Sequence, residues 1–557
     1  MDRQSSQAAN AGGVTQATLF LPRAHHACSG LPTERSAIMV HTQSRSTRLA
    51  ILRAAVLGMT VLAAGATHAQ TPISDVSSNP DGGDPSDPLA VTQCNGAPQL
   101  GVLYRNSESE PHLAVNPLNP ENMIAGWHQD RWSSGGAQSL GAAYTTDGGV
   151  SWTQVVIPFT RCSGATRRSA GDYERGSDPW ISFGPTGTAH YMALVTDKSV
   201  NENAMVTARS TDGGNTWSAP VAIARMPAQD PVLRSLFHDK NSLTADPFDE
   251  RLVYATWTLF RTGITSLVFA RSTNGGLTWS NPAPIATMGS GVGSSEKTIF
   301  RQGAQIVVLP DGTLINAFFR ILLDDATGEV TNEQAILRST DQGRHWTRLD
   351  TRVAPFESAS AVDTERDIPV RDASGLPSIA VNPGTGRLYI AWQDRNANGA
   401  GLVGVFVASS NDGGLTWSAP VRVNQGTSDE VQAFLPIVAV NEQGTVGVLF
   451  YDFRNDVLGD APLSTDVFLS LFTPELDFLG ERPLTASSFD MRQMVITGTR
   501  GFFPGDYVGL ARAGSDFVAA FTRSNNLGLP VVFPQNENGL FLDTHNRQDI
   551  VFVRETP

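Results

Sequence analysis

The chain has 557 residues, of which 40% are hydrophobic and only 17% are charged, and its formal net charge is −14. The apolar content is sufficient for a core and excludes a disordered chain, while the low charge excludes a long coiled coil. An acidic chain without a basic run also argues against a nucleic-acid binder. Length alone would allow three or four domains.

The first 69 residues are predicted to form a leader, with the true start near Met39. Three arginines between positions 45 and 53 precede an apolar run over residues 54–66, and a small-x-small cleavage motif follows at residues 67–69. The run is too short to anchor the chain in a bilayer. We therefore expect a secreted or periplasmic protein with no membrane span.

Residues 70–95 are predicted to be a linker rich in Asp, Gly and Pro, and residues 96–557 a single folded domain. Removal of the leader leaves two cysteines, Cys94 and Cys162. In an oxidising compartment these are expected to form a disulfide, the alternative being two buried thiols. The histidines show no paired ligand spacing, so we expect neither a metal nor another cofactor.

A short motif recurs five times and ends in Trp each time. Its central Asp or Asn advances by 65, 62, 67 and 71 residues. In each copy the Asp or Asn side chain can cap backbone N–H groups, and the Gly two residues later supplies a positive φ. The motif therefore predicts a tight turn with a structural role. The central residues are Asp147, Asp212, Asn274, Asp341 and Asp412.

A second pattern, a β-run followed by a Pro or Gly turn and another β-run, occurs seven times. The units begin 68, 62, 63, 73, 59 and 71 residues apart, starting at His112. Units of this length with about four strands are typical of propeller blades. We expect an all-β protein, a single β-propeller of four-stranded blades, with seven blades and six as the alternative. The run at residues 99–104 is expected to complete the last blade.

The five turn motifs resemble the Asp-box, or BNR repeat, of the sialidase superfamily, and the resemblance covers residues 105–555. It implies that the boxes lie opposite the active face. It also implies an exo-α-sialidase-type site with three arginines, a Tyr–Glu nucleophile pair and an Asp acid/base. Where that family has an Arg-Ile-Pro element on its first strand, this chain has Glu110, Pro111 and His112.

Ionisable residues stand before the first strand and after the second strand of nearly every unit, on the face without boxes. Around a ring they would converge on one mouth, where mixed acids and arginines suit acid–base chemistry on an anionic ligand. The alternative is that they pair with each other from blade to blade. The candidate catalytic residues are Asp239, Asp506, Tyr507, Tyr451 and Glu296. The candidate substrate-binding residues are Arg301, Arg320, Arg454, Arg131 and Arg395.

These features predict an exported, monomeric, sialidase-like glycoside hydrolase that acts on an acidic sugar. Arg301, Arg320 and Arg454 would bind the sugar carboxylate, an Asp would be the acid/base, and Tyr451 or Tyr507 the nucleophile. Two other functions stay open. One is a non-catalytic propeller that binds a glycan or a protein at the same mouth. The other is a polysaccharide lyase that uses Tyr and Arg on a uronic acid.

Overall fold

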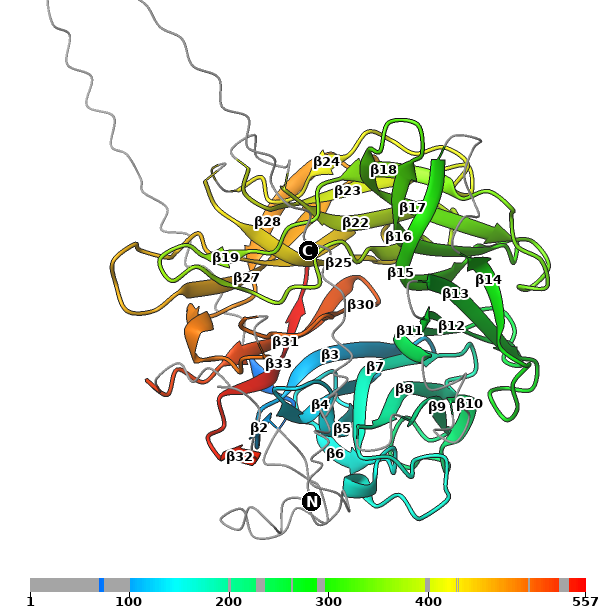
Figure 1. The fold of residues 1–557 in the computed structure, drawn as a ribbon, viewed down its shortest axis with the longest axis horizontal. Coiled ribbons are helices and arrows are strands. Elements are labelled where there is room, and N and C mark those ends of the chain that lie inside the picture. Colours follow the sequence, from blue (N-terminus) through cyan, green and yellow to red (C-terminus); the bar gives the residue numbers. More distant parts are fainter. Residues whose placement is uncertain are drawn as a thin grey trace, which may run out of the picture. The chain divides into compact units, whose positions relative to one another are not determined.

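A computed structural model gives the fold (Figure 1) and describes residues 70–74, 101–198, 202–226, 236–261, 264–287, 296–395, 401–426, 428, 430–498, 501–529 and 540–557. In these ranges the regular structure is β-strand with short 3₁₀ turns, which confirms the all-β prediction. No helix in the same ranges is long and apolar enough to cross a membrane. The predicted leader and most of the predicted linker lie outside them.

Most strands form small antiparallel sheets that follow one another along the chain, and we number the four-strand units in that order. Units 1 and 2 are joined in one ten-stranded sheet. Unit 1 is β3 (Ser109–Asn116), β4 (Asn119–Trp132), β5 (Ala137–Thr145) and β6 (Thr153–Val156). Unit 2 is β7 (Arg175–Phe183), β8 (Ala189–Asp197), β9 (Glu202–Ser210) and β10 (Val221–Met226). Unit 3 is β11 (Phe237–Ala245), β12 (Val253–Arg261), β13 (Ile264–Ser272) and β14 (Ala283–Thr287). Unit 4 is β15 (Glu296–Val308), β16 (Leu314–Asp324), β17 (Val330–Ser339) and β18 (Thr351–Phe356).

The second half of the chain repeats this arrangement. Unit 5 is β21 (Ser378–Val381), β22 (Leu388–Asp394), β23 (Gly404–Ser410) and β24 (Val421–Arg422). Unit 6 is β25 (Ala433–Val440), β26 (Val446–Asp452), β27 (Ser464–Phe472) and β28 (Phe478–Pro483), with β29 (Phe489–Asp490) beside β27. Unit 7 is β30 (Gly509–Ala513), β31 (Asp516–Ser524), β33 (Gln548–Glu555) and β1 (Thr71–Pro72). Shorter pieces are β2 (Gly101–Tyr104), β19 (Val362–Asp363), β20 (Ile368–Pro369), β32 (Leu540–Asp543) and the 3₁₀ turns η1 (Arg161–Ser163) and η4 (Met491–Gln493).

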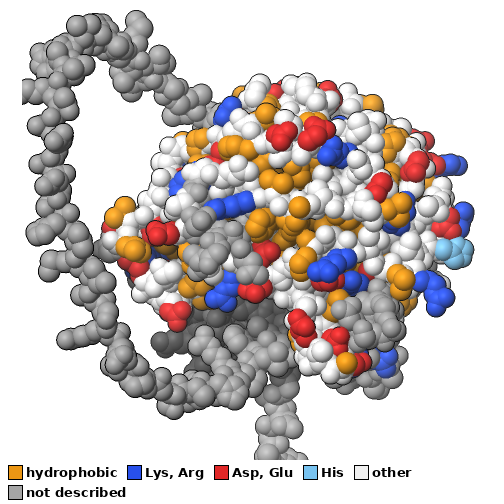
Figure 2. Space-filling view, turned by 90° about the horizontal axis from the view of Figure 1, so that it is seen from above, with side chains coloured by type: hydrophobic (Ala, Val, Ile, Leu, Met, Phe, Trp, Pro, Cys, Tyr) orange, Lys and Arg blue, Asp and Glu red, His pale blue; other side chains and the backbone are white. Residues whose placement is uncertain are grey.

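The first strands of successive units touch one another in a closed cycle. β3 contacts β7, β7 contacts β11, and the series continues through β15, β21 and β25 to β30, which contacts β3 again (Figure 1). Apart from a single pairing of β7 with β5, each first strand is an edge strand of its sheet, and the closed cycle packs that edge among the other first strands while each unit buries its faces against two neighbours. On the face seen in Figure 2, acidic and basic side chains lie scattered among uncharged ones instead of gathering by sign.

The strand that completes unit 7 is not the one expected from the sequence. Thr71 and Pro72 in β1 pair antiparallel with Phe552 and Val551 of β33. The expected run instead forms β2, which pairs in parallel with β32 and antiparallel with the end of β4. β1 can take the free edge of β33 because Ile73, which follows it, is buried in the core between units 7 and 1.

Of the two cysteines predicted to form a disulfide, only Cys162 lies in the described part of the chain. Cys162 is fully buried in η1 and is disulfide-bonded. Cys94 lies outside the described residues, so its pairing with Cys162 stays a prediction.

The five repeated motifs form similar hydrogen-bonded turns after the third strands of units 1 to 5. In the second copy, Asp212 Oδ1 accepts from the backbone N–H of Thr216 at 2.9 Å, and Ser210 Oγ accepts from that of Gly214 at 2.9 Å. The other four copies have the same pair of contacts. In unit 1 the turn lies at the end of the strands opposite to Ser109, because Ser109 pairs with His128 whereas Met123 pairs with Thr145.

The glycine two residues after the central Asp or Asn of a motif also fits one unit against the preceding one. Gly343, at the turn of unit 4, has φ +78°, and a Cβ atom there would overlap the Phe269 ring of unit 3. The ring of Trp346 packs edge-on against the same Phe269 at 5.3 Å between centroids. The turn motif therefore joins neighbouring units as well as reversing the chain.

Gly343→Ala should destabilise the protein more than Gly312→Ala does. Both glycines have a positive φ, +78° and +82°, but a Cβ at Gly312 meets nothing within 4 Å. Left-handed strain costs each variant about 1–2 kcal/mol, and the overlap with Phe269 should cost Gly343→Ala roughly 1–3 kcal/mol more. Denaturant unfolding measures both free energies. Equal losses would show that the contact between units contributes nothing.

Candidate functional site

The first strands of five units carry a bulge near their amino ends, and the bulges orient several charged side chains. Register shifts of this kind fall at equivalent places in β3, β7, β11, β15 and β25. Glu110, Asp178 and Lys240 sit in three of them with φ values of 55°, 54° and 54°. A non-glycine residue in this left-handed region costs about 1–2 kcal/mol, and bulges commonly redirect side chains next to functional sites. The bulges therefore bring charged groups from three units together near the amino ends of their first strands.

Asp506, just before β30, connects these groups across the cycle. Its Oδ2 lies 2.5 Å from Lys240 Nζ and 2.6 Å from Arg371 Nη2, and its Oδ1 accepts from Arg371 Nε at 3.1 Å. Its backbone N–H donates to Glu110 Oε1 at 3.1 Å. Burial would raise the pKa of Asp506, but Arg371 and Lys240 outweigh burial and hold it well below its ordinary value. Asp506 is therefore ionised at any working pH.

Tyr507 forms a hydrogen-bonded pair with a carboxylate of unit 2. Its Oη donates to Asp178 Oδ2 at 3.3 Å, its ring stands edge-on to Trp180 at 5.7 Å, and Lys240 Nζ lies 5.1 Å from the ring centroid. Burial and the surrounding carboxylates raise the pKa of Tyr507 well above its ordinary value. The phenol therefore keeps its proton until a neighbouring base removes it.

Asp239 differs from Asp506 in its protonation. Burial, with smaller contributions from Asp178 and Asp506 and against the opposing effect of Lys240, raises the pKa of Asp239 to about 7. Its Oδ1 accepts from the N–H of Lys240 at 2.9 Å. Two neighbouring carboxyl groups with pKa values driven apart are the arrangement that divides acid and base roles in hydrolases.

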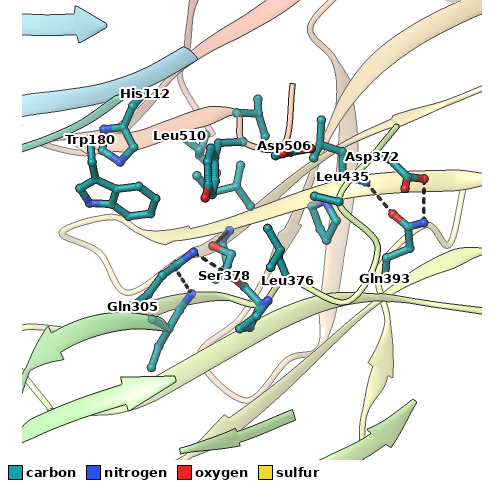
Figure 3. Close-up of a pocket in the computed structure, with 18 of the residues that line it drawn as sticks. His112, Trp180, Gln305, Asp372, Leu376, Ser378, Gln393, Leu435, Asp506 and Leu510 are labelled. Carbon is teal, nitrogen blue, oxygen red and sulfur yellow. Dashed lines mark hydrogen bonds between the residues drawn. The ribbon is translucent and has the colours of Figure 1, made fainter. Parts of the chain in front are cut away.

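A cavity of about 160 Å³ lies beside this charged cluster, between the first strands (Figure 3). Its walls include Asp506, Tyr507 and Asp372. Burial raises the pKa of Asp372 to about 6, and the carboxylate accepts from Gln393 Nε2 at 2.8 Å. The aromatic part of the wall is Trp180, half-buried, with His112 packed on it at 4.3 Å between ring centroids.

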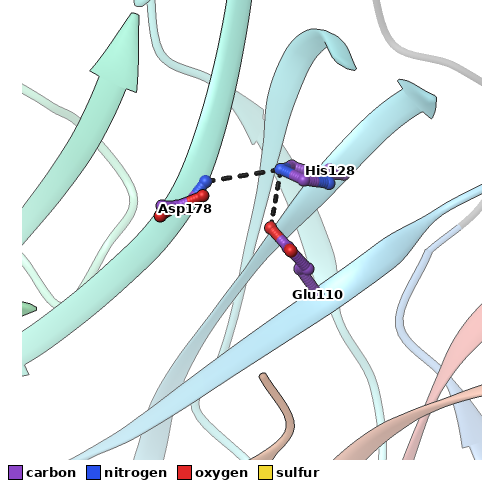
Figure 4. A group of neighbouring side chains, drawn as sticks. All are labelled: Glu110, His128 and Asp178. Carbon is purple, nitrogen blue, oxygen red and sulfur yellow. Dashed lines mark hydrogen bonds and ion pairs between the residues drawn. The ribbon is translucent and has the colours of Figure 1, made fainter. Parts of the chain in front are cut away.

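Glu110 and His128 form a second buried pair, next to Asp178 (Figure 4). His128 Nε2 lies 2.8 Å from Glu110 Oε2, and the N–H of Asp178 points to the same nitrogen at 3.3 Å. Burial raises the pKa of Glu110, but His128 outweighs burial and the net pKa is lowered.

The side chains of Glu110, His128 and Asp178 could hold a metal ion, since their ligand atoms lie within 4.8 Å of one another. Asp178, however, already accepts from Ser177 Oγ, the N–H of Lys240 and Tyr507. We assign no metal here.

Three of the five predicted catalytic residues come together in this cluster: Asp239, Asp506 and Tyr507. Arg131 lies beside them, with its guanidinium 4.6 Å from the centre of the Phe503 ring, and Arg371 lies at the same distance from that ring. Arg371 and His128 were not among the predicted residues. Arg371 carries a usable signal, because it precedes Asp372 at the position before a first strand where the other candidates stand.

Of the other two predicted catalytic residues, Tyr451 lies away from the cluster, and the side chain of Glu296 is not described. Tyr451 lies in the core between units 6 and 7, where its Oη donates to the carbonyl of Thr522 at 3.0 Å and its ring stacks on Phe434. Its prediction as a nucleophile is wrong, because the hydroxyl is satisfied by backbone inside packed side chains. Glu296 begins β15, and its side chain lies outside the described residues.

The predicted three-arginine clamp does not form. Arg301 and Arg320 both bind Asp350 Oδ2, at 2.8 and 2.9 Å. Arg454, in unit 6, pairs with Asp452 and Glu481. Each guanidinium therefore has a carboxylate of its own unit as its partner, whereas the alternative expected from the sequence was pairing from one unit to the next. Arg395 is exposed and donates to the carbonyl of Gly401.

No protein-family model and no curated protein matches the chain. Among solved structures, a Hadza microbial sialidase matches at 14% identity and a TM-score of 0.41, covering 78% of this chain and 74% of its own. An α-L-arabinofuranosidase from Fusarium graminearum with an iminosugar inhibitor matches at 10% identity and 0.41, covering 68% and 97%. A protein of unknown function from Dyadobacter fermentans matches at 12% and 0.39, covering 82% and 98%. These values are too low to establish a shared activity.

Asp506→Asn should strongly destabilise the protein. The substitution leaves Lys240 and Arg371 buried without their shared counter-charge, which typically costs about 3–5 kcal/mol. Differential scanning calorimetry should show a large fall in Tm. Asp249→Asn is the matched control, because it removes a carboxylate whose partner, Arg251, has a side chain 72% exposed. A similar Tm for the two variants would contradict the central role of Asp506.

Proposed function

We propose that the chain is a sialidase-like glycoside hydrolase whose reaction takes place at the cavity beside Asp506. We also propose that its units are the blades of a single seven-bladed β-propeller with Asp-box turns. The closed cycle of first strands and the recurring turns support the fold. The hydrogen bond from Tyr507 Oη to Asp178 Oδ2, at the cavity wall, carries the function.

Tyr507 is the nucleophile in this proposal. Its oxygen attacks the anomeric carbon while its proton passes to Asp178, and the bond to the leaving-group oxygen breaks. Asp239 gives its proton to that oxygen. In the second half of the reaction, Asp239 takes a proton from water, the water attacks the anomeric carbon, and Tyr507 leaves with the proton held by Asp178.

Asp239 suits the acid/base role because its pKa is raised to about 7 by burial. A group with this pKa can give a proton in one step and take one in the next near neutral pH. Asp506 cannot share the role, since Lys240 and Arg371 keep it ionised. Its part is to hold both cations, and with them the bulges, in place.

A non-catalytic binding protein is the second candidate function. The observation that favours it is the internal pairing of the cluster, in which Asp506 already binds Lys240 and Arg371. A ring of satisfied ion pairs could serve only to hold the units together, with the cavity as a binding site. We propose export for either function, with removal of residues 1–69 ahead of the strand that completes unit 7.

Tyr507→Phe should reduce kcat on an aryl glycoside by about 10⁴-fold or more, because it removes the attacking oxygen. The assay is release of the aryl group from a panel of 4-nitrophenyl glycosides. Tyr451→Phe is the control, since it removes a hydroxyl that is also buried but does not line the cavity. Full activity in Tyr507→Phe, or equal losses in both variants, would exclude this nucleophile.

The pH profile should lose activity as the pH rises through about 7, because Asp239 must carry its proton to act as the acid. The raised pKa means that the active protonated form dominates below that value. Asp239→Asn should remove this alkaline limb and cut kcat/KM by about 10²–10⁴-fold on poor leaving groups. It should have much less effect on 2,4-dinitrophenyl glycosides. If Asp239→Asn kept the same alkaline limb, the limb would belong to another group and the acid role of Asp239 would be contradicted.

A further inference from the structure

We propose that the ligand of this cavity is an uncharged sugar, a neutral glycoside and not a sialic or uronic acid. This inference rests on the proposed function for its reaction, but it concerns the chemistry of the cavity walls alone. It departs from the acidic sugar expected from the sequence, and three observations on the walls carry it.

The cations near the cavity already have partners. Lys240 and Arg371 both bind Asp506, and Arg371 does so through two of its nitrogens. Arg131 donates to the carbonyls of Trp132 and Gly136 and lies over Phe503. Recognition of a sugar carboxylate typically uses a guanidinium fork presented to the ligand. In the described part of the cluster, each of these cations is engaged with the protein instead.

The cluster also contains more carboxylates than a bound anion would tolerate. Glu110 and Asp178 are 1% and 2% exposed, and Asp506, at the cavity wall, is 5% exposed. A sugar carboxylate would enter a desolvated space beside these groups, and it would have to share Lys240 and Arg371 with Asp506, which already serves as their common counter-ion. Like charges in a space of low dielectric disfavour such a ligand strongly.

The walls suit hydroxyl groups and an apolar ring face. Asp372 and Asp506 offer carboxylate oxygens, which only accept hydrogen bonds, and a sugar hydroxyl can donate to them whereas a carboxylate cannot. The amide of Gln393 does not present its N–H groups to a ligand, because its Nε2 donates to the carbonyl of Ala359 and to the carboxylate of Asp372. The half-buried ring of Trp180 provides an apolar surface for the C–H face of a sugar.

The size of the cavity limits how much of a glycan can enter. At about 160 Å³ it is smaller than the roughly 300 Å³ at which pockets for drug-sized ligands begin. One sugar ring with its hydroxyls is the largest unit we expect inside. The remainder of a longer glycan would extend out of the cavity, which fits removal of a terminal residue.

The decisive experiment compares 4-nitrophenyl glycosides that differ only in one carboxylate. The pairs are glucoside with glucuronide and galactoside with galacturonide, alongside a xyloside, an arabinofuranoside, a glucosaminide with a free amine and a sialoside. We expect a neutral glycoside to have a kcat/KM about 10²-fold or more above those of the charged ones. Its KM should change less than about twofold between roughly 0.01 M and 1 M salt, since no ion pair forms with the ligand.

Preference for a carboxylated or an amino glycoside would overturn the inference and leave the proposed hydrolysis standing. Absence of all turnover would remove the proposed hydrolysis, and binding would then decide the inference. In that case a glycan array with neutral, sialylated and uronic glycans should show binding to neutral glycans only. Binding to acidic glycans, or to none, would overturn it.

A variant of the wall supplies an independent readout. Trp180→Ala should raise the KM for the neutral substrate, or its Kd in the binding assay, by about tenfold. Trp279→Ala is the matched control, because it removes a half-buried Trp from a turn at the end of unit 3 opposite to the cluster. An unchanged KM in Trp180→Ala would contradict the assigned ring surface.

Discussion

The ion pairs of Asp506 with Lys240 and Arg371 are the interaction on which the described structure depends most. They join a residue before β30 to β11 and to the segment before β21, so one carboxylate connects parts of the cycle that lie 135 and 266 residues from it along the chain. Burying so much charge is favourable only when all partners are present, because each group left alone would carry a large desolvation penalty. The same pairing fixes the protonation of the site. It keeps Asp506 ionised, and its charge helps to keep a proton on Asp239.

The two ends of the strands have different tasks. At one end, the turn motifs pack glycine and tryptophan against the preceding unit, which gives rigid contacts that require little charge. At the other end, left-handed residues in the bulges direct Glu110, Asp178 and Lys240 to a common point. Strain at that end can persist because the turns and the closed cycle hold the strands from the other side. A preorganised site of this kind does not have to rearrange its charges during a reaction.

Sequence reasoning located the units and the turns because both depend on contacts between residues near each other in the chain. It also selected Asp239, Asp506 and Tyr507, which lie close together in the structure because each stands just before a first strand or near its start. It could not choose between arginines. Arg301 and Arg371 occupy similar positions, and their roles differ only because Asp350 lies beside the first and Asp506 beside the second. Such partners are 49 and 135 residues away. The pairing of β1 could not be predicted for the same reason. Either residues 71–72 or residues 99–104 could have paired with β33, and both are distant from it in the sequence.

The central claim is that Tyr507 is the group that attacks the sugar. Its most direct test is covalent trapping with a 2-deoxy-2-fluoro derivative of the neutral glycoside that is turned over best, followed by peptide mass spectrometry. The account predicts one added fluoroglycosyl group on the peptide that contains Tyr507, and no label on that peptide in Tyr507→Phe. A label on any other residue, or turnover of the substrate without a label at Tyr507, would contradict it.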